Sequence, residues 1–392
     1  MTQTVAIVGG GAIGSSIAYF LTNDPLFKGE VVVIERDPAY RFASSALSAS
    51  SIRQQFSTPV NVELSRFGIG FLRDIGDRMA VDGDRPALSL IERGYLVTAG
   101  EESVPTMREV HAIQQDLGVP SALLDPRQLV ERFPWISAEG VALASIGLKD
   151  EGWFDGYGLL QAFRKKARSL GVRYVADEAT GFARSGDRVT AVELKGGESI
   201  PCDLAVNAAG PWSGKVAALL GVDLPVRARK RNVFIFSCRE KLADFPPIMD
   251  LSGIWMRPEG DKYIVGYTPK DEEPDPDDRP LDVIDDEMFE EKIWEPLAAR
   301  VPAFEAIKRQ GAWAGYYEVN TLDHNGVVGP HPALANVLFA SGFSGHGIQH
   351  SPGVGRAVAE LVIHGGYRSI DLSPLSFERV IAGRPMLEKN IF

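Results

Sequence analysis

The stretch TVAIVGGGAIGSSIAYFL, residues 4–21, decides the fold of this chain. Its apolar start, Val5 to Val8, predicts a buried strand, and the apolar spacing after the glycines predicts a helix. The run VVVIERD, residues 31–37, then predicts a second strand. A strand, a helix and a strand within about 35 residues form a βαβ unit with a right-handed crossover.

Three glycines in the turn of this unit, Gly9, Gly11 and Gly14, have the GxGxxG spacing of dinucleotide-binding proteins. The first permits a tight turn, the second lets backbone approach a pyrophosphate, and the third lets helix and strand pack closely. The free N–H groups and the positive dipole end of the helix favour phosphates. Glu35 ends the second strand, where a carboxylate accepts ribose hydroxyls and disfavours a 2′-phosphate. The unit therefore predicts a dinucleotide other than NADP.

The length, charge and cysteine usage of the chain exclude several classes of protein. Its 392 residues suffice for two domains, and the net charge of −11 argues against a nucleic-acid partner. Cys202 and Cys238 lie far apart and predict neither a disulfide framework nor a zinc site, so we expect no metal. No apolar run suits an integral membrane segment, and the first strand leaves no room for a signal peptide. We therefore expect a cytoplasmic protein.

Two later segments repeat the strand-and-turn pattern of a nucleotide-binding element. The sequence DLAVNAAG, residues 203–210, is a strand that runs into a small-residue turn. The sequence NVLFASGFSGHGIQHSPGVGRAVAELV, residues 336–362, is a strand, a glycine-rich turn and a helix. Between these elements, helical spacing is also expected over residues 59–79. One cofactor domain assembled from distant pieces fits this pattern better than two domains in tandem.

The expected domains are therefore discontinuous. The cofactor domain is expected to contain residues 1–80, 146–221 and 322–392. The substrate-binding domain is expected to contain residues 81–145 and 222–321.

Six segments together resemble the D-amino-acid oxidase superfamily of FAD-dependent oxidoreductases. They are VAIVGGGAIGSSIAYFL, VVVIERD, ASSALSASSIRQQF, LAVNAAGPWS, WAGYYEVNTLDHNGVVGP and SGFSGHGIQHSPGVGRAVAELV, in this order along nearly the whole chain. The superfamily includes sarcosine oxidase, glycine oxidase, D-amino-acid dehydrogenases and dimethylglycine dehydrogenase. Within it, the sequences of these segments are most similar to the branch of the mitochondrial FAD-dependent oxidoreductase-domain protein linked to complex I assembly.

This resemblance implies a fold and a cofactor. The fold is α/β and has two domains, so that the whole chain is of the two-domain α+β type. One of them is a Rossmann-like FAD-binding domain of the glutathione-reductase type. An interleaved substrate domain on a mixed or antiparallel sheet completes it. The implied cofactor is FAD, because the last segment is far more specific than the first motif, which NAD enzymes share.

The resemblance also implies which residues contact FAD. They lie in the first turn, at the end of the second strand, in the serine-rich stretch, in the middle turn and in the last glycine loop. The expected contacts are Gly9, Gly11, Ala12, Ile13, Gly14, Glu35, Arg36, Ser44, Ser45, Ser48, Ala179, Ala208, Ala209, Gly210, Trp212, Gly315, Gly342, Gly345, His346, Gly347, Ile348 and Gln349.

Five residues are the implied substrate-side or catalytic groups. Arg53 matches the arginine with which sarcosine oxidases hold the substrate carboxylate, and a guanidinium offers the planar fork that a carboxylate needs. His346 and Gln349 are expected against the flavin ring, where some amine oxidases have a lysine in place of the uncharged Gln349. Tyr317 is a candidate hydroxyl contact and Arg257 a second anion clamp.

Departures from the family pattern refine the expectation. The segment Ala314 to Glu318 lacks the cysteine that attaches flavin covalently in some relatives, so we expect non-covalent FAD. It also lacks the carboxylate-binding arginine of glycine-oxidase-like members. Ile264 stands where some oxidases have an oxygen-activating lysine, which favours a dehydrogenase that passes electrons to a quinone or another carrier over one that uses oxygen.

The expected reaction is oxidation of a small amino acid or secondary amine, such as a D-amino acid, an N-methyl amino acid or an opine. Hydride leaves the α-carbon for flavin N5, and water hydrolyses the resulting imine. One alternative is oxidation of a 2-hydroxy acid, which needs a base such as His346 or His350. A second is a flavin-bearing assembly or interaction protein with little turnover. A third, an NAD-dependent dehydrogenase, is disfavoured by the C-terminal glycine loop.

Overall fold

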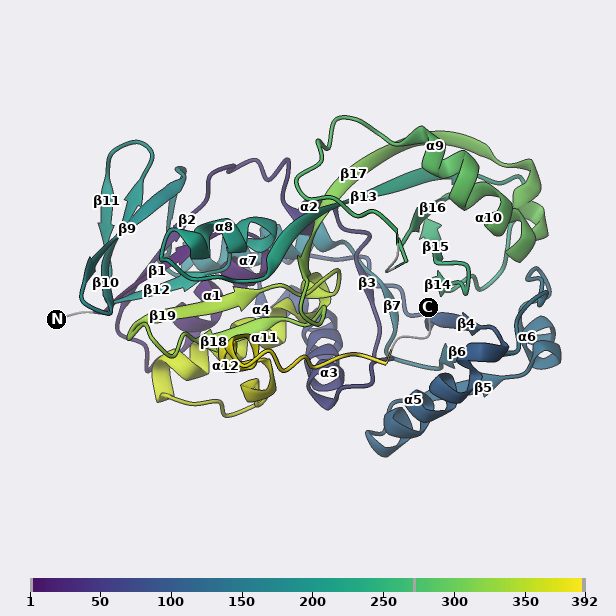
Figure 1. Cartoon of the computed structure of the whole chain (residues 1–392), viewed down its shortest axis with the longest axis horizontal. Coiled ribbons are helices and arrows are strands. Elements are labelled where there is room, and N and C mark those ends of the chain that lie inside the picture. The colour runs from purple at the N-terminus through teal and green to yellow at the C-terminus, as the bar shows by residue number, and fades with distance from the viewer. Residues whose placement is uncertain (1–2, 271–272, 390–392) are drawn as a thin grey trace.

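The computed structural model describes residues 3–270 and 273–389 of the chain. The expected βαβ unit opens a six-stranded sheet of order β18-β19-β12-β1-β2-β8 (Figure 1). All neighbours in this sheet are parallel except β18, which is antiparallel to β19. The strands are β1 Thr4–Val8, β2 Glu30–Ile34, β8 Arg173–Val175, β12 Leu204–Asn207, β18 Val327–Pro330 and β19 Val337–Ser341.

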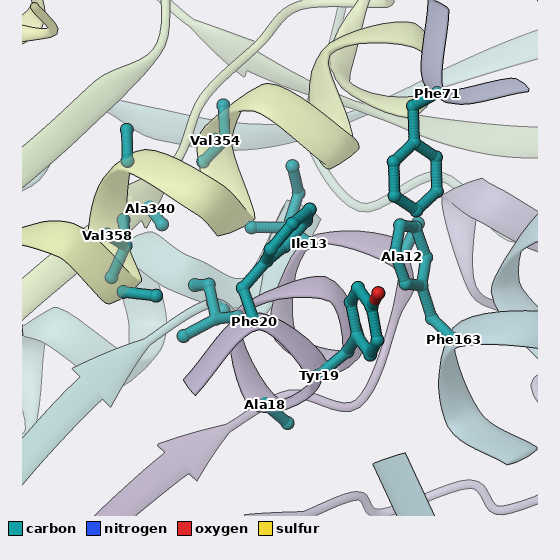
Figure 2. Packing of buried hydrophobic residues seen from close by; sticks show 14 of the residues in the cluster. Ala12, Ile13, Ala18, Tyr19, Phe20, Phe71, Phe163, Ala340, Val354 and Val358 are labelled. Atoms are coloured by element: carbon teal, nitrogen blue, oxygen red, sulfur yellow. The ribbon is translucent and has the colours of Figure 1, made fainter. Parts of the chain in front are cut away.

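Helix α1, Ala12–Asn23, lies at the centre of the packing around this sheet. Figure 2 shows Tyr19 and Phe20 of this helix beside Phe71 and Phe163, which come from two other helices. Those helices are α3, Pro59–Arg73, and α7, Gly156–Ser169. Because α1 is apolar on nearly every side, it is buried between the sheet and its neighbouring helices.

Helix α11, Gly347–His364, packs closely on α1 because small residues face each other there. A β-carbon at Gly355 would lie 2.0 Å from Oγ of Ser16, so no larger side chain fits. The start of α11 also touches α3, because a β-carbon at Gly68 would lie 2.4 Å from the Gln349 carbonyl oxygen. These contacts fix the first turn of α11 relative to the sheet.

A second, mixed sheet of eight strands has the order β17-β13-β16-β15-β14-β4-β6-β5. It is antiparallel apart from the β14–β4 pair. Its two long strands, β13 and β17, curve from the six-stranded part on the left of Figure 1 to this sheet on the right. The strands are β4 Leu96–Ala99, β5 Ser121–Leu124, β6 Leu143–Gly147, β13 Val226–Ser237, β14 Ile248–Met249, β15 Ile254–Glu259, β16 Lys262–Tyr267 and β17 Lys308–Asn320.

Shorter elements complete the fold. The strands are β3 Ser51–Ile52 paired with β7 Gly152–Trp153, and a three-stranded sheet of β9 Ala179–Ser185, β10 Arg188–Leu194 and β11 Ser199–Pro201. The helices are α2 Ser44–Leu47, α4 Ile75–Arg78, α5 Val104–Asp116, α6 Pro126–Arg132, α8 Ser213–Ala218, α9 Asp286–Met288, α10 Trp294–Arg300 and α12 Phe377–Ile381. The helix expected over residues 59–79 is interrupted at Asp74, whose backbone (φ −93°, ψ 6°) leaves the helical region.

The fold class expected from the sequence is confirmed: an α/β chain with a Rossmann-like sheet and a second, mixed sheet. The six-stranded sheet takes its strands from residues 4–34, 173–207 and 327–341, and the eight-stranded sheet takes them from 96–147 and 226–320. Among the described residues, no helix combines the length and the apolar character needed to cross a bilayer.

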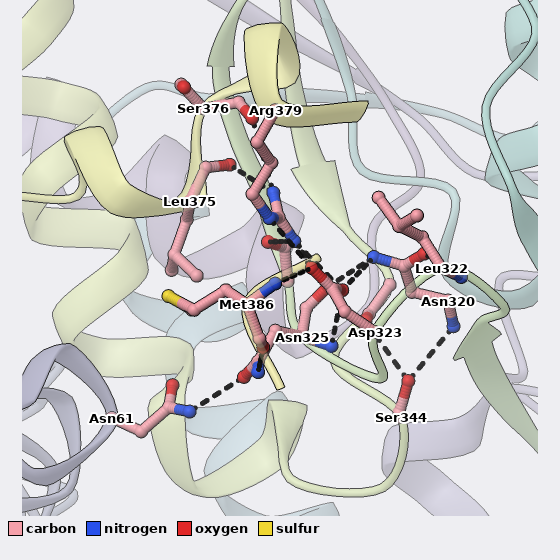
Figure 3. Close-up of polar contacts among 12 residues, drawn as sticks. Asn61, Asn320, Leu322, Asp323, Asn325, Ser344, Leu375, Ser376, Arg379 and Met386 are labelled. Carbon is pink, nitrogen blue, oxygen red and sulfur yellow. Dashed lines mark hydrogen bonds and ion pairs between the residues drawn. The ribbon is translucent and has the colours of Figure 1, made fainter. Parts of the chain in front are cut away.

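A buried polar cluster fastens the end of the chain to the turn after β17 (Figure 3). Nε of Arg379 donates to Oδ2 of Asp323 at 2.9 Å, and both side chains are almost fully buried. The same oxygen accepts the backbone N–H of Met386 at 2.9 Å, and the Met386 carbonyl accepts Nδ2 of Asn325 at 2.6 Å. Asp323 is therefore the common acceptor of this cluster.

The segment after Met386 then reaches the start of α3. The Glu388 carboxylate accepts the backbone N–H of Ser57 at 2.6 Å and Nδ2 of Asn61 at 2.6 Å, and it also accepts the Thr58 hydroxyl. An anion at a helix N-terminus is stabilised by the free N–H groups and the helix dipole. Residues far apart in sequence are thus joined beside α3 and α11.

We expect the substitution Arg379→Met to destabilise the protein by about 3–5 kcal/mol, because it leaves the Asp323 carboxylate buried without its cation. Chemical denaturation followed by circular dichroism measures the free energy of unfolding. The control is Arg127→Met, which removes the solvent-exposed pair with Glu131 and should cost less than about 1 kcal/mol. Equal effects of the two substitutions would show that the Asp323 cluster does not stabilise the fold.

Candidate functional site

The turn after β1 brings two backbones into direct contact. Gly9 has φ +101°, and a β-carbon there would lie 2.3 Å from the carbonyl oxygen of Ala208, which follows β12. A β-carbon at Gly14 would lie 1.9 Å from the Gly9 carbonyl oxygen. Only glycine fits at both positions, because the first needs a left-handed backbone and both lack space for a side chain.

The start of α1 faces the space beside this turn. The N-cap residue Gly11 has no side chain with which to cap the helix, and the N–H of Ala12 makes only a long contact of 3.4 Å to Oγ of Ser45. The Glu35 carboxylate accepts the backbone N–H groups of Gly10 and Asp37, each at 2.8 Å. Burial raises the pKa of Glu35, while these two N–H groups oppose the rise. Glu35 is therefore held in a fixed orientation at the end of β2.

A cavity of about 430 Å³ opens along the turns after β1, β2, β12 and β19. Most of the residues expected to contact FAD line it: Gly9, Gly11, Ala12, Ile13, Glu35, Arg36, Ser44, Ser45, Ser48, Ala179, Ala208, Ala209, Gly210, Trp212, Gly315, Gly345, Gly347 and Ile348. Four others, Gly14, Gly342, His346 and Gln349, do not line it.

One end of the cavity is bordered by aromatic and charged side chains. The Arg36 guanidinium lies 3.8 Å from the centre of the Trp212 ring, and Tyr316 meets the same ring edge-on at 5.7 Å. Arg36 also contacts Glu178 at 3.5 Å. These flat groups beside Ala179 form a surface on which another planar ring can stack.

The glycine loop after β19 forms the opposite part of the wall. Gly342, Ser344 and Gly345 all have left-handed backbones, with φ of +82°, +48° and +103°. A β-carbon at Gly345 would lie 2.5 Å from the Tyr317 ring, so the loop backbone is pressed against that side chain. Helix α11 then begins at Gly347 with no side-chain cap among the described residues.

Gln349, expected against the flavin ring, binds other protein groups instead. Its Oε1 accepts the backbone N–H of Arg53 at 2.8 Å, and its Nε2 lies 3.3 Å from Nε2 of His350. The side chain is buried between α11, α3 and the segment after β3. Its role in this structure is to fix the position of Arg53 relative to α11.

The guanidinium of Arg53 has no carboxylate partner among the described residues. It lies 4.4 Å from the Phe56 ring centre and 5.9 Å from the Tyr95 ring centre. Its hydrogen bond is to the Gln55 carbonyl, at 3.3 Å. Aromatic faces stabilise a cation but leave most of its N–H groups free. Arg53 is therefore able to bind an anion.

His346, at the end of the glycine loop, and His350, in the first turn of α11, lie near Arg53. The rings of His346 and His350 are 5.0 Å apart, and Phe56 contacts both. Burial, with the nearby Arg53 charge, lowers the pKa of His350 to about 3 and that of His346 well below its usual range. Both imidazoles are neutral at pH 7. Nε2 of His346 is buried without a hydrogen-bond partner among the described residues.

Tyr317 and Arg257 reach this region from the eight-stranded sheet. Tyr317 lines the cavity, and the Arg231 guanidinium lies 5.5 Å from its ring. Arg257 is almost fully buried, and its Nε donates to the Ala49 carbonyl at 2.7 Å. It also pairs with Glu259. Arg257 thus joins the sheet to the segment after α2, and its guanidinium is already engaged.

Two buried glutamates were missed by sequence reasoning. Glu318 lines the cavity, and Glu151 accepts the Gln54 N–H at 2.6 Å and Nε2 of Gln55 at 2.9 Å. Burial raises the pKa of both carboxyls to about 7. A glutamate inside the aromatic run YYEVN was the available signal for Glu318, whereas Glu151 follows a turn and has no local signal.

Chemically, the site offers a deep cavity lined by small residues, with an uncapped helix start at each of two turns. An unpaired guanidinium and two neutral imidazoles lie around Phe56 and do not line the cavity. The described residues contain no cluster of three or more histidine, cysteine or acidic side chains that could hold a metal ion.

Comparison with known proteins identifies the family. The model of the family described as FAD dependent oxidoreductase matches residues 4–361. The "FAD-dependent oxidoreductase domain-containing protein 1" of Xenopus laevis is 46% identical over 99% of this chain and 84% of its own length. The mitochondrial sarcosine dehydrogenase of Mus musculus is 25% identical over 93% of this chain and 40% of its own length.

A solved structure has the same fold along the whole chain. L-proline dehydrogenase from P. horikoshii superposes with a TM-score of 0.85 at 25% identity, over 98% of this chain and 99% of that one. The cavity described above therefore lies in a flavoenzyme fold. The chain belongs to the FAD-dependent oxidoreductase family, and its cofactor is FAD.

Proposed function

We propose that FAD is held non-covalently in the cavity along the carboxyl ends of β1, β2 and β12. The close approach of Gly9 to Ala208 brings the turns after β1 and β12 together along this cavity. Neither Cys202 nor Cys238 lines the cavity, so no thiol is available there to attach the cofactor. The residues present fit the group.

We assign the parts of the cofactor by the chemistry of the wall. The turn at Gly9 and Gly11 and the uncapped start of α1 suit the pyrophosphate, and Glu35 suits the ribose hydroxyls. The surface of Arg36 and Trp212 suits the adenine. The remaining wall is assigned to the ribityl chain and the flavin: Ser44, Ser45, Ser48, Gly315, Gly345, Gly347 and Ile348.

We propose that the protein oxidises a small amino acid or secondary amine. The observation that carries this proposal is the unpaired Arg53 guanidinium, which would hold the substrate carboxylate through two parallel hydrogen bonds. Gln349 orients Arg53, and Phe56 and Tyr95 pack around it. When bound, FAD supplies the acceptor for the hydride of the substrate α-carbon, and water hydrolyses the imine product.

The names of related proteins support an amine donor. Besides sarcosine dehydrogenase, a 29% identical relative from Paenarthrobacter nicotinovorans is a 4-methylaminobutanoate oxidase. Both names denote N-methylated amines that carry a carboxylate. An amine that arrives neutral needs no protein base.

We further propose a dehydrogenase that passes electrons to a quinone or another carrier. Ile264, fully buried on β16, lies directly opposite Arg257 on β15. Directly opposite residues share one face of a sheet. The cation directly opposite Ile264 is thus Arg257, which is already bonded to the Ala49 carbonyl and Glu259 and is less free to meet oxygen.

Oxidation of a 2-hydroxy acid is the second candidate. It needs a base for the hydroxyl proton, and the neutral His346, with Nε2 unpartnered among the described residues, could accept that proton.

Both free cysteines fit a reducing compartment, and we propose a cytoplasmic location.

A screen of flavin reduction under nitrogen separates these functions. We expect bleaching of the flavin absorbance by amino acids of one class, D-, L-, N-methylated or opine-type, and not by 2-hydroxy acids. Bleaching by 2-hydroxy acids alone would replace the amine proposal. Absence of bleaching by every donor, together with a co-purifying partner protein, would indicate an assembly or interaction role.

We expect Gly9→Ala to raise the Kd for FAD at least about tenfold. The left-handed backbone costs about 1–3 kcal/mol for alanine, and the new methyl group meets the Ala208 carbonyl oxygen. Fluorescence titration of the apoprotein with FAD measures the change. Gly70→Ala is the control, since it lies exposed in α3 with no atom within 4 Å of the new β-carbon. Unchanged FAD affinity in Gly9→Ala would refute the placement of the pyrophosphate.

We expect Arg53→Gln to weaken binding of the reducing amino acid by about 10- to 150-fold, which corresponds to about 1.5–3 kcal/mol for a hydrogen bond to a charged group. Arg53→Lys should be intermediate, because it keeps the charge but loses the planar fork. The substrate concentration that gives half-maximal flavin reduction is the measurement. The half-exposed Arg78, paired with Asp74, provides the control Arg78→Gln. Wild-type affinity in Arg53→Gln would remove Arg53 from the substrate site.

A further inference from the structure

Glu318 is a buried carboxyl group in the cavity wall that the proposed reaction does not use. It lies on β17, is 9% exposed, and lines the cavity together with Gly210, Gly345 and Gly347. No ion pair of the described residues includes it, and burial raises its pKa to about 7. Its surroundings therefore differ from those of Glu35, whose carboxylate accepts the backbone N–H groups of Gly10 and Asp37.

The carboxyl group lies against the glycine loop and the first residue of α11. Its Oε2 accepts the Gly342 N–H at 3.2 Å, and the Phe343 N–H also bonds to it. A β-carbon at Gly347 would lie 2.9 Å from its Oε1. The Glu318 carbonyl accepts the Ser344 N–H at 3.2 Å, so the whole residue is fixed to this loop.

This position places a titratable group at the positive end of a long helix. The start of α11 carries the equivalent of about half a positive charge, and no described side chain caps it. An ionised Glu318 reverses the sign of the charge at this place, whereas a protonated Glu318 leaves the positive end of the helix intact. Gln349, in the first turn of α11, adds no charge of its own.

We propose that Glu318 sets the reduction potential of the bound flavin through the charge of its carboxyl group. Hydride uptake adds two electrons and one proton to the oxidised flavin, so the flavin gains one negative charge. An ionised carboxylate in the same wall opposes that charge, and a neutral carboxyl does not. This inference rests on the cofactor placement proposed above but not on the substrate.

The other charged groups around Glu318 keep their state near neutral pH. On the neighbouring strand β13, Arg227 and Arg229 pair with Asp277, and Arg231 pairs with Asp275. Arg36, across the Trp212 turn, stays cationic beside Glu178. In the glycine loop His346 is neutral, and on β17 burial raises the pKa of Tyr316 and Tyr317, so both stay neutral. Glu318 is the group among them whose charge changes near pH 7.

The test measures the midpoint potential of the flavin in the holoenzyme by dye-mediated electrochemical titration without substrate, at pH 5.5 and pH 8.5. We expect Glu318→Gln to favour the reduced flavin at least about tenfold at pH 8.5, a rise of about 30 mV for a two-electron couple. At pH 5.5 the variant and the wild type should have the same potential, because Glu318 is then protonated.

Two further variants control for structural effects. Glu151→Gln removes a buried carboxyl with a similarly raised pKa that does not line the cavity, and it should leave the potential unchanged at both pH values. Glu318→Met, neutral and of similar length, replaces Glu318→Gln if that variant loses FAD. An unchanged potential at pH 8.5, or an equal shift at both pH values, would overturn the proposal. Because no substrate is added, this outcome is independent of the amine screen.

Discussion

The contact between the backbones of Gly9 and Ala208 is the constraint on which the site depends. It holds the turns after β1 and β12 so close that no side chain fits between them. Because β1 and β12 are parallel neighbours and β19 lies next to β12, the turns that follow all three strands meet at one edge of the sheet. Ligands of open α/β sheets bind at this carboxyl edge. Three segments far apart in sequence thereby form one wall of the cavity.

The long strands β13 and β17 connect this wall to the second sheet. At one end β17 carries Tyr317 and Glu318, which touch the glycine loop, and further along it belongs to the eight-stranded sheet. The segment after β3 makes the second connection, because its Arg53 N–H bonds to Gln349 of α11 and its Gln55 side chain bonds to the Tyr95 carbonyl of the other sheet. The substrate side is therefore positioned by hydrogen bonds rather than by one continuous element.

The fold and the meeting of its glycine-rich and small-residue turns at one sheet edge could be predicted because their signals are local. GxGxxG spacing, a run of β-branched residues and the loop at Gly342 to Gly347 each specify a backbone shape within a few residues. The helix expected over 59–79 is broken at Asp74. No strong sequence signal marks this break, so it was not predicted. The bonds of Gln349 to Arg53 and of Glu388 to the start of α3 join residues about 300 positions apart. No local pattern encodes such pairings, so the surroundings of Arg53 and the place of Glu318 became evident only in the folded chain.

The two sides of the site differ in how their charges are balanced. On the substrate side, the Arg53 guanidinium lies among aromatic rings and neutral imidazoles, forms no ion pair among the described residues, and opposes the rise in the pKa of the buried Glu151. On the cofactor side, the helix start at Gly347 meets Glu318, whose carboxyl can be neutral or ionised near pH 7. A carboxylate substrate would neutralise Arg53, so that the bound pair carries no net charge. In the proposed arrangement, the charge that develops on reduction is stabilised by the helix start, which a protonated Glu318 leaves intact and an ionised Glu318 cancels.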